Sequence, residues 1–290
     1  MTVVLGLLAA VFWGVTDFLG GPAARRVGVA HVVFVSNVIG LVAVAAAMIV
    51  WAPGRDKLFT APGIGIAFSL AGALCLLAAT STLSRALRSG RASIIAPIAM
   101  SYGVVTTALS YFSGETISTL HLVGIGICVA GIPLTGMSSQ RSGSTSDSTT
   151  HSVLLAVAAM LCFGVSYWLQ GRFAVPRVGA LGYLLINYLC VAALTGAYLY
   201  ISWIRSRGKE REPPLRRYPL VVAQGVMSLL GLACFSWGMA SGITAVVAVL
   251  STFSGAVTAV LARILRHEEL RPVQWLGICI VIFGTCVVRL

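Results

Sequence analysis

Asp17 is the acidic residue of this sequence best placed to do chemistry, because it lies well inside a long apolar segment, residues 3–22. The other acids lie at the ends of such segments or between them. A charge at the centre of a bilayer costs about 2.5–3.5 kcal/mol on insertion scales, so Asp17 should face a helix bundle or a wet cavity, or be protonated. We predict that it binds a proton, a cation or the cationic group of a substrate. A structural, hydrogen-bonded aspartate beside a helix break at Gly20-Gly21-Pro22 is the alternative.

Four more polar side chains stand out by position. Asn37 and Asn187 are amides within apolar segments, where hydrocarbon offers no hydrogen-bond partner, so both should point inward, to bridge helices or to contact a substrate. Glu115 and Glu268 each precede an apolar segment. A carboxylate favours the positive N-terminus of the following helix by about 0.3–1 kcal/mol, so we interpret both as helix-capping residues.

Aromatic residues recur in the apolar segments and could form the flat wall of a cavity, although aromatic rings also fill cores, face lipid or anchor at the interface. The candidates are Trp13, Tyr102, Phe163, Tyr167, Trp168 and Trp237, with Trp13 and Trp168 preferred. Hydroxyl and amide groups nearby could bind a substrate or satisfy carbonyls of their own helices. These are Thr16, Ser166, Gln224, Ser236 and Ser254.

Signatures of enzymes are missing from the sequence. It contains no H-E-x-x-H, no G-x-S-x-G and no G-x-x-x-x-G-K-[ST] motif. The four histidines are scattered without a cysteine or carboxylate at ligand spacing, and the seven cysteines lie in apolar segments without C-x-x-C spacing. We therefore predict no catalytic residue, no metal and no cofactor, and we interpret the cysteines as free thiols used in packing.

The elements that position these residues are membrane helices. Of the 290 residues 58% are apolar and 10% charged, against about a quarter charged in soluble domains. Lys and Arg collect in the short connecting segments, which indicates contact with anionic headgroups of a lipid bilayer and no binding of nucleic acid. Segments of about 20 residues, enough to cross ~30 Å of hydrocarbon, lie at 3–22, 29–51, 62–84, 92–113, 117–136, 153–172, 179–204, 218–240, 243–262 and 271–288.

The ten predicted helices form two related halves. Gly14-Val15 matches Gly164-Val165, and Asn37 matches Asn187, at a shift of about 150 positions. Glu115 with its following glycines also matches Glu268 with Gly277 and Gly284 at identical spacing. Five helices per half make the second copy enter the membrane from the opposite side, as an inverted repeat whose interface holds the binding site. We assign residues 1–137 and 153–290 to the repeats and 138–152 to a polar, Ser/Thr-rich linker.

The glycines of the last helix in each half suggest a close packing seam. Gly124 and Gly131 are seven residues apart, as are Gly277 and Gly284, so each pair lies on nearly one helical face. Packing within one chain is the first interpretation. A homodimer is the alternative.

Several segments resemble the EamA-type transporters of the drug/metabolite transporter superfamily. The resemblance rests on residues 12–21, on Arg85-Ala86-Leu87 to Pro97, and on the stretches 114–124 and 267–277. It implies a ten-helix carrier in which helices one, three and four, with helices six, eight and nine, surround a central cavity. The two halves depart from strict symmetry, since Pro97 has Val249 opposite it and Tyr102 has Ser254.

We therefore expect an all-α integral membrane protein of the plasma membrane. It should be a secondary transporter that exports a small-molecule substrate, a metabolite or amphiphilic compound, by alternating access, driven by a coupling proton or cation or by the substrate gradient. A membrane enzyme acting on lipid and a pore are the alternatives. The positive-inside rule puts both termini outside, whereas the resemblance puts them inside. The predicted substrate-binding residues are Asp17, Trp13, Thr16, Asn37, Tyr102, Tyr167, Trp168, Asn187, Trp237 and Ser254.

Overall fold

Apolar segments of this chain fold into helices, because a helix satisfies its own backbone hydrogen bonds where water is absent. The computed structural model describes residues 1–50, 52–89, 98–115, 118–135, 146–206, 218–266 and 272–289, and these residues contain no strand. The elements are α1 (Thr2–Val27), α2 (Val29–Val50), α3 (Ala52–Phe59), α4 (Gly63–Ser89), α6 (Tyr102–Phe112), α7 (Thr119–Thr135), α8 (Ser146–Leu169), the π-helical η1 (Gln170–Ala174), α9 (Val175–Arg205), α10 (Pro219–Ser241), α11 (Thr244–Ser251), α12 (Ser254–Arg266) and α13 (Pro272–Arg289).

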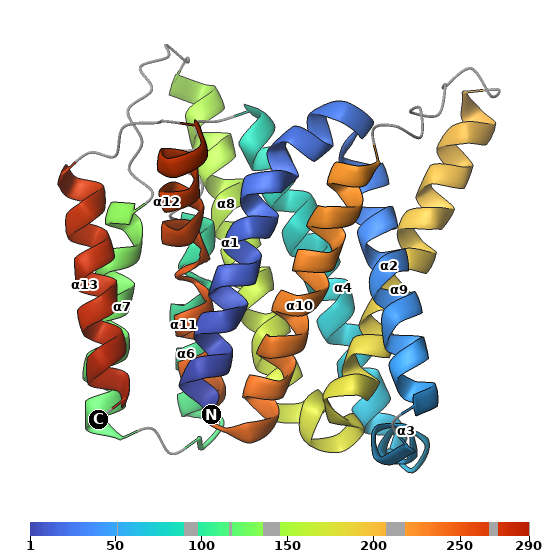
Figure 1. Cartoon of the computed structure of the whole chain (residues 1–290), viewed down its shortest axis with the longest axis horizontal. Helices are drawn as coiled ribbons and strands as arrows, with labels where there is room; N and C mark the ends of the chain where they lie inside the picture. The colour runs from blue at the N-terminus through green and yellow to red at the C-terminus, as the bar shows by residue number, and fades with distance from the viewer. Residues whose placement is uncertain are drawn as a thin grey trace.

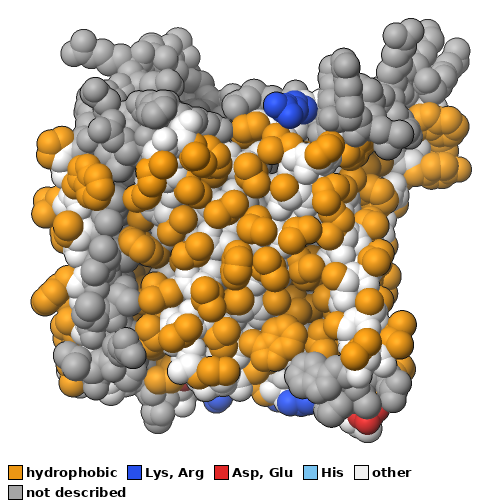
Figure 2. Space-filling view, in the orientation of Figure 1, with side chains coloured by type: hydrophobic (Ala, Val, Ile, Leu, Met, Phe, Trp, Pro, Cys, Tyr) orange, Lys and Arg blue, Asp and Glu red, His pale blue; other side chains and the backbone are white. Residues whose placement is uncertain are grey.

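The chain is a multi-pass membrane protein. Five helical stretches of the described residues are long and apolar enough to cross a membrane, namely Thr2–Ala24, Val29–Val50, Gly63–Leu83, His151–Arg205 and Pro219–Ser241. Shorter apolar helices cover Ile98–Phe112, Leu122–Gly131 and Thr244–Thr258. Figure 2 shows hydrophobic side chains across the middle of one face, with Lys, Arg and acidic side chains at its upper and lower margins. This belt is the surface expected of a protein in lipid.

The stretch His151–Arg205 makes more than one crossing. Its 55 residues would measure about 80 Å as one straight helix, more than twice the thickness of the hydrocarbon layer. Gly179 interrupts it with a φ of 77° and a ψ of 165°, a conformation that glycine adopts without a steric penalty. Figure 1 shows α8 descending and α9 ascending on either side of this region, so the predicted helices at 153–172 and 179–204 are separate crossings.

Three predicted boundaries differ from the structure. Helix α1 continues through Pro22 to Val27, so no break occurs at Gly20-Gly21-Pro22. Proline is tolerated in membrane helices, where neighbouring groups satisfy the backbone atoms that it frees. Helix α8 begins at Ser146, so part of the expected linker 138–152 is helical. The segment expected at 243–262 is two helices, α11 and α12, with a turn at Thr252 and Phe253 between them.

The helices of the two halves pack against each other in equivalent pairs. Helix α1, the first membrane helix of the first half, packs along α10, the third of the second half. Helix α4, the third of the first half, packs along α8, the first of the second half. Helix α7 lies beside α13, and α2 beside α9 (Figure 1). The glycines of the predicted seam, Gly124, Gly131, Gly277 and Gly284, are all buried. Their helices, α7 and α13, pack within the chain, as in the first interpretation of the seam.

Both ends of the chain lie on one face of the bundle, which we call the termini face (Figure 1). Helix α1 leaves this face, whereas its counterpart α8 runs toward it. Such opposite directions are consistent with an inverted pair of repeats.

A break in helical hydrogen bonding occurs at corresponding places in the two halves. The Ser101 amide donates to the Ile98 carbonyl at 3.1 Å, and the Phe253 amide donates to the Leu250 carbonyl at 3.2 Å. Both are tight i to i+3 bonds, and a new helix starts at the following residue, Tyr102 or Ser254. Discontinuous helices are typical of binding sites in transporters, since irregular backbone within a membrane is tolerated where it lines a cavity.

Candidate functional site

A cavity of about 340 Å³ lies between the two halves of the chain. Helices α1, α2, α4 and α6 contribute from the first half, and α8, α9, α10 and α12 from the second. Helices α2 and α9 therefore line the cavity in addition to the six helices expected from the resemblance. The lining residues are Trp13, Thr16, Asp17, Val32, Val33, Ser36, Asn37, Leu76, Leu77, Thr80, Leu83, Met100, Tyr102, Phe163, Tyr167, Asn187, Tyr188, Val191, Gln224, Ser228, Leu232 and Ser254.

The cavity is displaced toward the face opposite the termini. Its α2 residues, from Val32 to Asn37, and two of its three α10 residues, Gln224 and Ser228, fall in the first half of each helix, and Leu232 lies just past the middle of α10. Both helices begin on the opposite face (Figure 1). The termini face is therefore separated from the cavity by a thicker layer of packed side chains.

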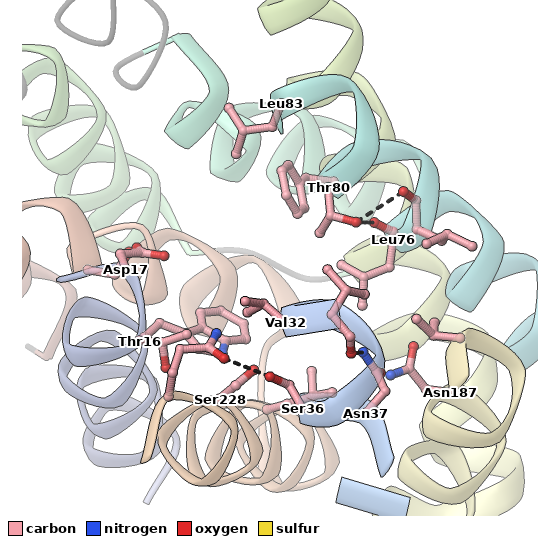
Figure 3. A pocket seen from close by; sticks show the side chains of 18 of the residues that line it. Thr16, Asp17, Val32, Ser36, Asn37, Leu76, Thr80, Leu83, Asn187 and Ser228 are labelled. Atoms are coloured by element: carbon pink, nitrogen blue, oxygen red, sulfur yellow. Dashed lines mark hydrogen bonds between the residues drawn. The ribbon is translucent and has the colours of Figure 1, made fainter. Parts of the chain in front are cut away.

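Asp17 is the acidic residue of the cavity wall. Its side chain is exposed although it lies inside a membrane helix, and it points into the space between α1 and the helices opposite (Figure 3). Among the described residues, none forms a hydrogen bond or ion pair with its carboxylate. The lining residues in the described ranges include no Lys, Arg or His. Asp17 is therefore the charged side chain of the described lining, and no described residue pairs with it.

Four aromatic rings from both halves line the cavity, and a fifth, the fully buried Phe235, packs against two of them. Tyr167 is central: its ring centroid lies 5.8 Å from that of Trp13, 5.0 Å from Tyr102, 6.0 Å from Phe163 and 4.6 Å from Phe235. Offset and tilted ring pairs at such distances are attractive beyond the area that they bury. We call Trp13, Tyr102, Phe163, Tyr167 and Phe235 the aromatic floor.

Gly231 makes room for the indole of the aromatic floor. A Cβ atom at this position would lie 2.4 Å from Trp13 Cδ1 and 2.6 Å from its Nε1. No side chain larger than hydrogen fits there unless the indole shifts. The close approach of α10 to α1 therefore fixes the place of Trp13.

Polar bonds lie behind the aromatic floor, out of reach of the cavity. Gln170 Nε2 donates to Ser236 Oγ at 2.7 Å, and both residues are fully buried. Ser166 Oγ donates to the carbonyl oxygen of Gly72 at 2.8 Å. The hydroxyls of Ser166 and Ser236 therefore join neighbouring helices, whereas the alternative given from the sequence was a bond to a carbonyl of their own helix.

Asn37 and Asn187 lie across the cavity from Asp17 (Figure 3). Together with Gln224, which bonds to Ser36 next to Asn37, they are three neutral carboxamides of the lining, and we call them the amide end. Asn37 Nδ2 donates to the carbonyl oxygen of Val33 at 2.8 Å, and Gln224 Oε1 accepts from Ser36 Oγ at 2.6 Å. Both bonds leave further donors or acceptors on the same amides.

Two polar atoms at the amide end have no hydrogen-bond partner among the described residues. These atoms are Asn187 Oδ1 and the hydroxyl of the adjacent Tyr188. Asn187 is 1% exposed and Tyr188 is 4% exposed. A buried polar group without a partner destabilises a protein, so each exception calls for an explanation in ligand or water binding.

The hydroxyls of Thr16 and Tyr102 are engaged although both residues line the cavity. Thr16 Oγ1 donates to the Phe12 carbonyl oxygen at 2.9 Å. The Tyr102 hydroxyl lies 3.0 Å from Ser251 Oγ, and Ser251 in turn donates to the Ala248 carbonyl at 2.8 Å. Because a serine has one hydroxyl proton, Tyr102 is the donor of the pair. Its ring, rather than its hydroxyl, faces a ligand.

Eight of the ten predicted substrate-binding residues lie at this cavity, and two do not. Trp168 Nε1 donates to Ser113 Oγ at 2.9 Å, and its ring packs edge-on against Phe173. Trp237 packs beside the buried cluster around Leu184, on the side of α10 that faces α9. Helical periodicity turns these two indoles away, since Trp168 follows Tyr167 by one residue, or about 100° around the helix.

Glu115 caps a helix, but not the one that follows it. Its Oε1 accepts a 2.5 Å hydrogen bond from the backbone amide of Thr244, the first residue of α11 in the other half. The carboxylate therefore lies at a positive helix end, as predicted, although it reaches across the repeat interface instead of capping α7. Gly114 makes the turn that directs it, with a φ of 79°. Glu268 lies outside the described residues.

Four polar lining residues, Ser36, Thr80, Tyr188 and Ser228, were not singled out from the sequence. Ser36 and Tyr188 each adjoin a predicted asparagine, and Ser228 lies one helical turn after Gln224, so a nearby amide was the available signal for these three. No such signal marks Thr80.

These features define a helical membrane protein with a cavity between two repeated halves. The sequence pattern of the EamA-like transporter family matches residues 1–137 and again residues 150–290. The chain therefore belongs to this family of membrane transporters, and each match covers one half of it.

Two further likenesses agree with this assignment. A solved structure, described only as a crystal structure of a protein, superposes with a TM-score of 0.79 over 99% of this chain and 95% of that one. At 19% identity this likeness shows the fold alone. An uncharacterized protein of Methanocaldococcus jannaschii is 29% identical over 137 residues, which are 47% of this chain and 96% of that protein. Its length is thus about that of one half.

Proposed function

We propose that this protein is a secondary transporter that exports a small metabolite or amphiphilic compound from the cell by alternating access. The observation that carries the proposal is a cavity between two repeated halves whose acid, Asp17, is exposed and has no partner among the residues that the structure describes. A carrier needs such a site near the interface of its repeats, reached from one side at a time. The plasma membrane is the location that an exporter requires.

The aromatic floor is the barrier that closes the pathway toward the termini face in this conformation. Its rings come from both halves, so rocking one half against the other separates Trp13 and Tyr102 from Phe163 and Tyr167. The same motion closes the opposite side. Packed interfaces of this kind switch between discrete arrangements rather than deforming continuously.

Asp17 supplies the coupling in this proposal. A carboxylate that binds either a proton or a cation, but not both, links the movement of one to the movement of the other. An ion gradient therefore drives export without nucleotide hydrolysis, and the sequence contains no nucleotide-binding motif.

The experiment is solute exchange in proteoliposomes. A growth screen of an overexpressing strain against toxic cations, zwitterions, anions and neutral compounds first selects the solutes, so the test assumes no substrate class. A carrier gives saturable uptake and counterflow. Product formation indicates an enzyme that acts on lipid, and flux that does not saturate indicates a pore; either result overturns the proposal.

The role of Asp17 is tested with a matched pair of variants. Asp17→Asn should abolish exchange driven by a pH gradient, whereas Asp56→Asn, in the exposed helix α3, should leave it unchanged. Wild-type rate and pH dependence in a well-folded Asp17→Asn variant would remove the coupling role.

A further inference from the structure

The charge of the cavity selects the charge of its ligand. Among the described residues that line the cavity, Asp17 is the acid, and none is Lys, Arg or His. A carboxylate attracts a cation, and the apolar side chains around Asp17 screen this attraction less than bulk water does. A carboxylate on the ligand would lie near Asp17 without a cationic partner in the cavity. Amines are thus favoured over anions, and also over zwitterions such as amino acids.

The aromatic floor selects the body of the ligand. Trp13, Tyr102 and Tyr167 line the cavity together with Asp17, and aromatic rings bind both flat apolar groups and cations. A small, strongly hydrated inorganic ion gains little from such a wall. An organic ammonium ion gains from the carboxylate, the ring faces and burial of its carbon atoms together.

The amide end selects a neutral polar group at the other end of the ligand. Asn37, Asn187 and Gln224 carry no charge, and each amide offers both donors and acceptors. Asn187 Oδ1 and the Tyr188 hydroxyl have hydrogen-bonding capacity that no described residue uses. Asp17 and Asn187 lie on opposite sides of the cavity (Figure 3), so one ligand can meet both.

We infer that the cavity takes monovalent organic amines that have a flat apolar body and a hydroxyl or amide at the far end. The ammonium group pairs with Asp17, the body rests on the aromatic floor, and the neutral group bonds to the amide end. This inference rests on the proposed transport function, because it treats the cavity as the substrate site.

A series of compounds with one shared phenyl-ethyl body tests each part of the inference by equilibrium binding to the purified protein. Tyramine has both polar groups, phenethylamine lacks the hydroxyl, and 4-ethylphenol lacks the amine. Tyrosine adds a carboxylate to tyramine, and 3-(4-hydroxyphenyl)propionate replaces its amine with one. Tyramine should bind most tightly, phenethylamine about 3- to 10-fold more weakly, and the two carboxylates at least roughly 100-fold more weakly.

Substitutions test whether Asp17 causes the preference for the amine and Asn187 the preference for the hydroxyl. Asp17→Asn should bring tyramine to the affinity of 4-ethylphenol, whereas Asp17→Glu should retain the preference for the amine. Asn187→Leu should bring tyramine to the affinity of phenethylamine and keep the preference for the amine. Leu189→Ala is the control on the same helix, because its side chain is 56% exposed and lies outside the cavity lining.

Results of two kinds overturn the inference. One is tyrosine or the propionate binding as tightly as tyramine; the other is a folded Asp17→Asn variant that still prefers the amine. Saturable counterflow of an anion without exchange of tyramine also overturns the ligand class, but it keeps the protein a carrier. Tight tyramine binding to a protein that exchanges no solute supports the ligand class and overturns the transport function.

Discussion

The side chain of Thr258 donates a hydrogen bond to the backbone carbonyl of Gly14 at 3.0 Å, and Thr106 makes the same bond to Gly164 at 3.1 Å. Each glycine lies in the first helix of one half, and each threonine lies in the fourth helix of the other. The repeat seen in the sequence is therefore also a repeat of atomic contacts. Both bonds cross the interface that lies beside the cavity.

Alanine at either glycine should destabilise the protein. An added Cβ would lie 2.5 Å from Val257 Cβ at Gly14, and 2.5 Å from Val105 Cβ at Gly164. Overpacking of this kind costs about 1–3 kcal/mol, so Gly14→Ala and Gly164→Ala should each lower the melting temperature in detergent. Thermal unfolding followed by size exclusion measures the effect.

Second substitutions provide the control. Val257→Gly should partly rescue Gly14→Ala, and Val105→Gly should partly rescue Gly164→Ala, because glycine lacks the Cβ atom that the added Cβ would meet. Gly20→Ala should be tolerated, since nothing lies within 4 Å of its added Cβ. Equal losses at Gly20 and Gly14 would contradict the packing explanation.

Glu115 should contribute to stability through α11 of the other half. Glu115→Ala removes the acceptor of the Thr244 amide, which should destabilise the protein by about 1–3 kcal/mol. Glu115→Gln keeps an acceptor oxygen and loses only the favourable charge at the helix end, about 0.3–1 kcal/mol. Urea or thermal unfolding measures how much stability each of the two variants loses. A larger loss for glutamine than for alanine would exclude the capping role.

Substitutions of Trp13, Trp168 and Trp237 should have different effects on ligand affinity. Trp13→Ala removes part of the aromatic floor and should weaken tyramine binding by about tenfold or more, the loss expected for one desolvated aromatic contact. Trp168→Phe and Trp237→Phe should change the dissociation constant less than about twofold, because both indoles lie outside the cavity lining. Titration of each folded variant checks this. Similar losses at all three positions would place the binding site elsewhere.

Gln170 should be replaceable by an apolar side chain of similar length. Its Oε1 is buried without a hydrogen-bond partner among the described residues, so Gln170→Met removes a polar atom that is already unsatisfied. Ser236 can then bond to a carbonyl of its own helix. We expect Gln170→Met to change stability by less than about 1.5 kcal/mol and Gln170→Ala to cost about 2 kcal/mol or more, since alanine leaves a void. The unfolding midpoints of the two variants, compared with that of the wild type, test this expectation.

The sequence predicted which segments cross the membrane more reliably than where they are interrupted. Apolar length is a property of each segment alone, so the long helices α1, α2, α4 and α10 follow from it. The turn at Thr252 and Phe253 and the continuation of α1 through Pro22 depend on neighbouring helices. Local propensity does not report such tertiary contacts.

The candidate site was predictable where polarity singled out a residue and less so where only aromatic character did. Asp17, Asn37 and Asn187 are polar within apolar segments, and all three line the cavity. Trp168 and Trp237 have apolar rings that suit a core, a lipid face or a cavity equally, so their direction depended on helix rotation. The partner of Glu115 lies 129 residues away, a distance at which sequence offers no spacing rule.

In the proposed carrier, the off-centre position of the cavity determines where the membrane voltage falls. Water entering from the side opposite the termini would reach the exposed Asp17, so the voltage would drop mainly across the packed side chains beneath the aromatic floor. A charge held at Asp17 therefore crosses little of the field while it binds. It crosses most of it, about 2.3 kcal/mol per elementary charge at 100 mV, when the floor opens. Voltage should accordingly alter the rate of the conformational switch and leave affinity from the open side nearly unchanged.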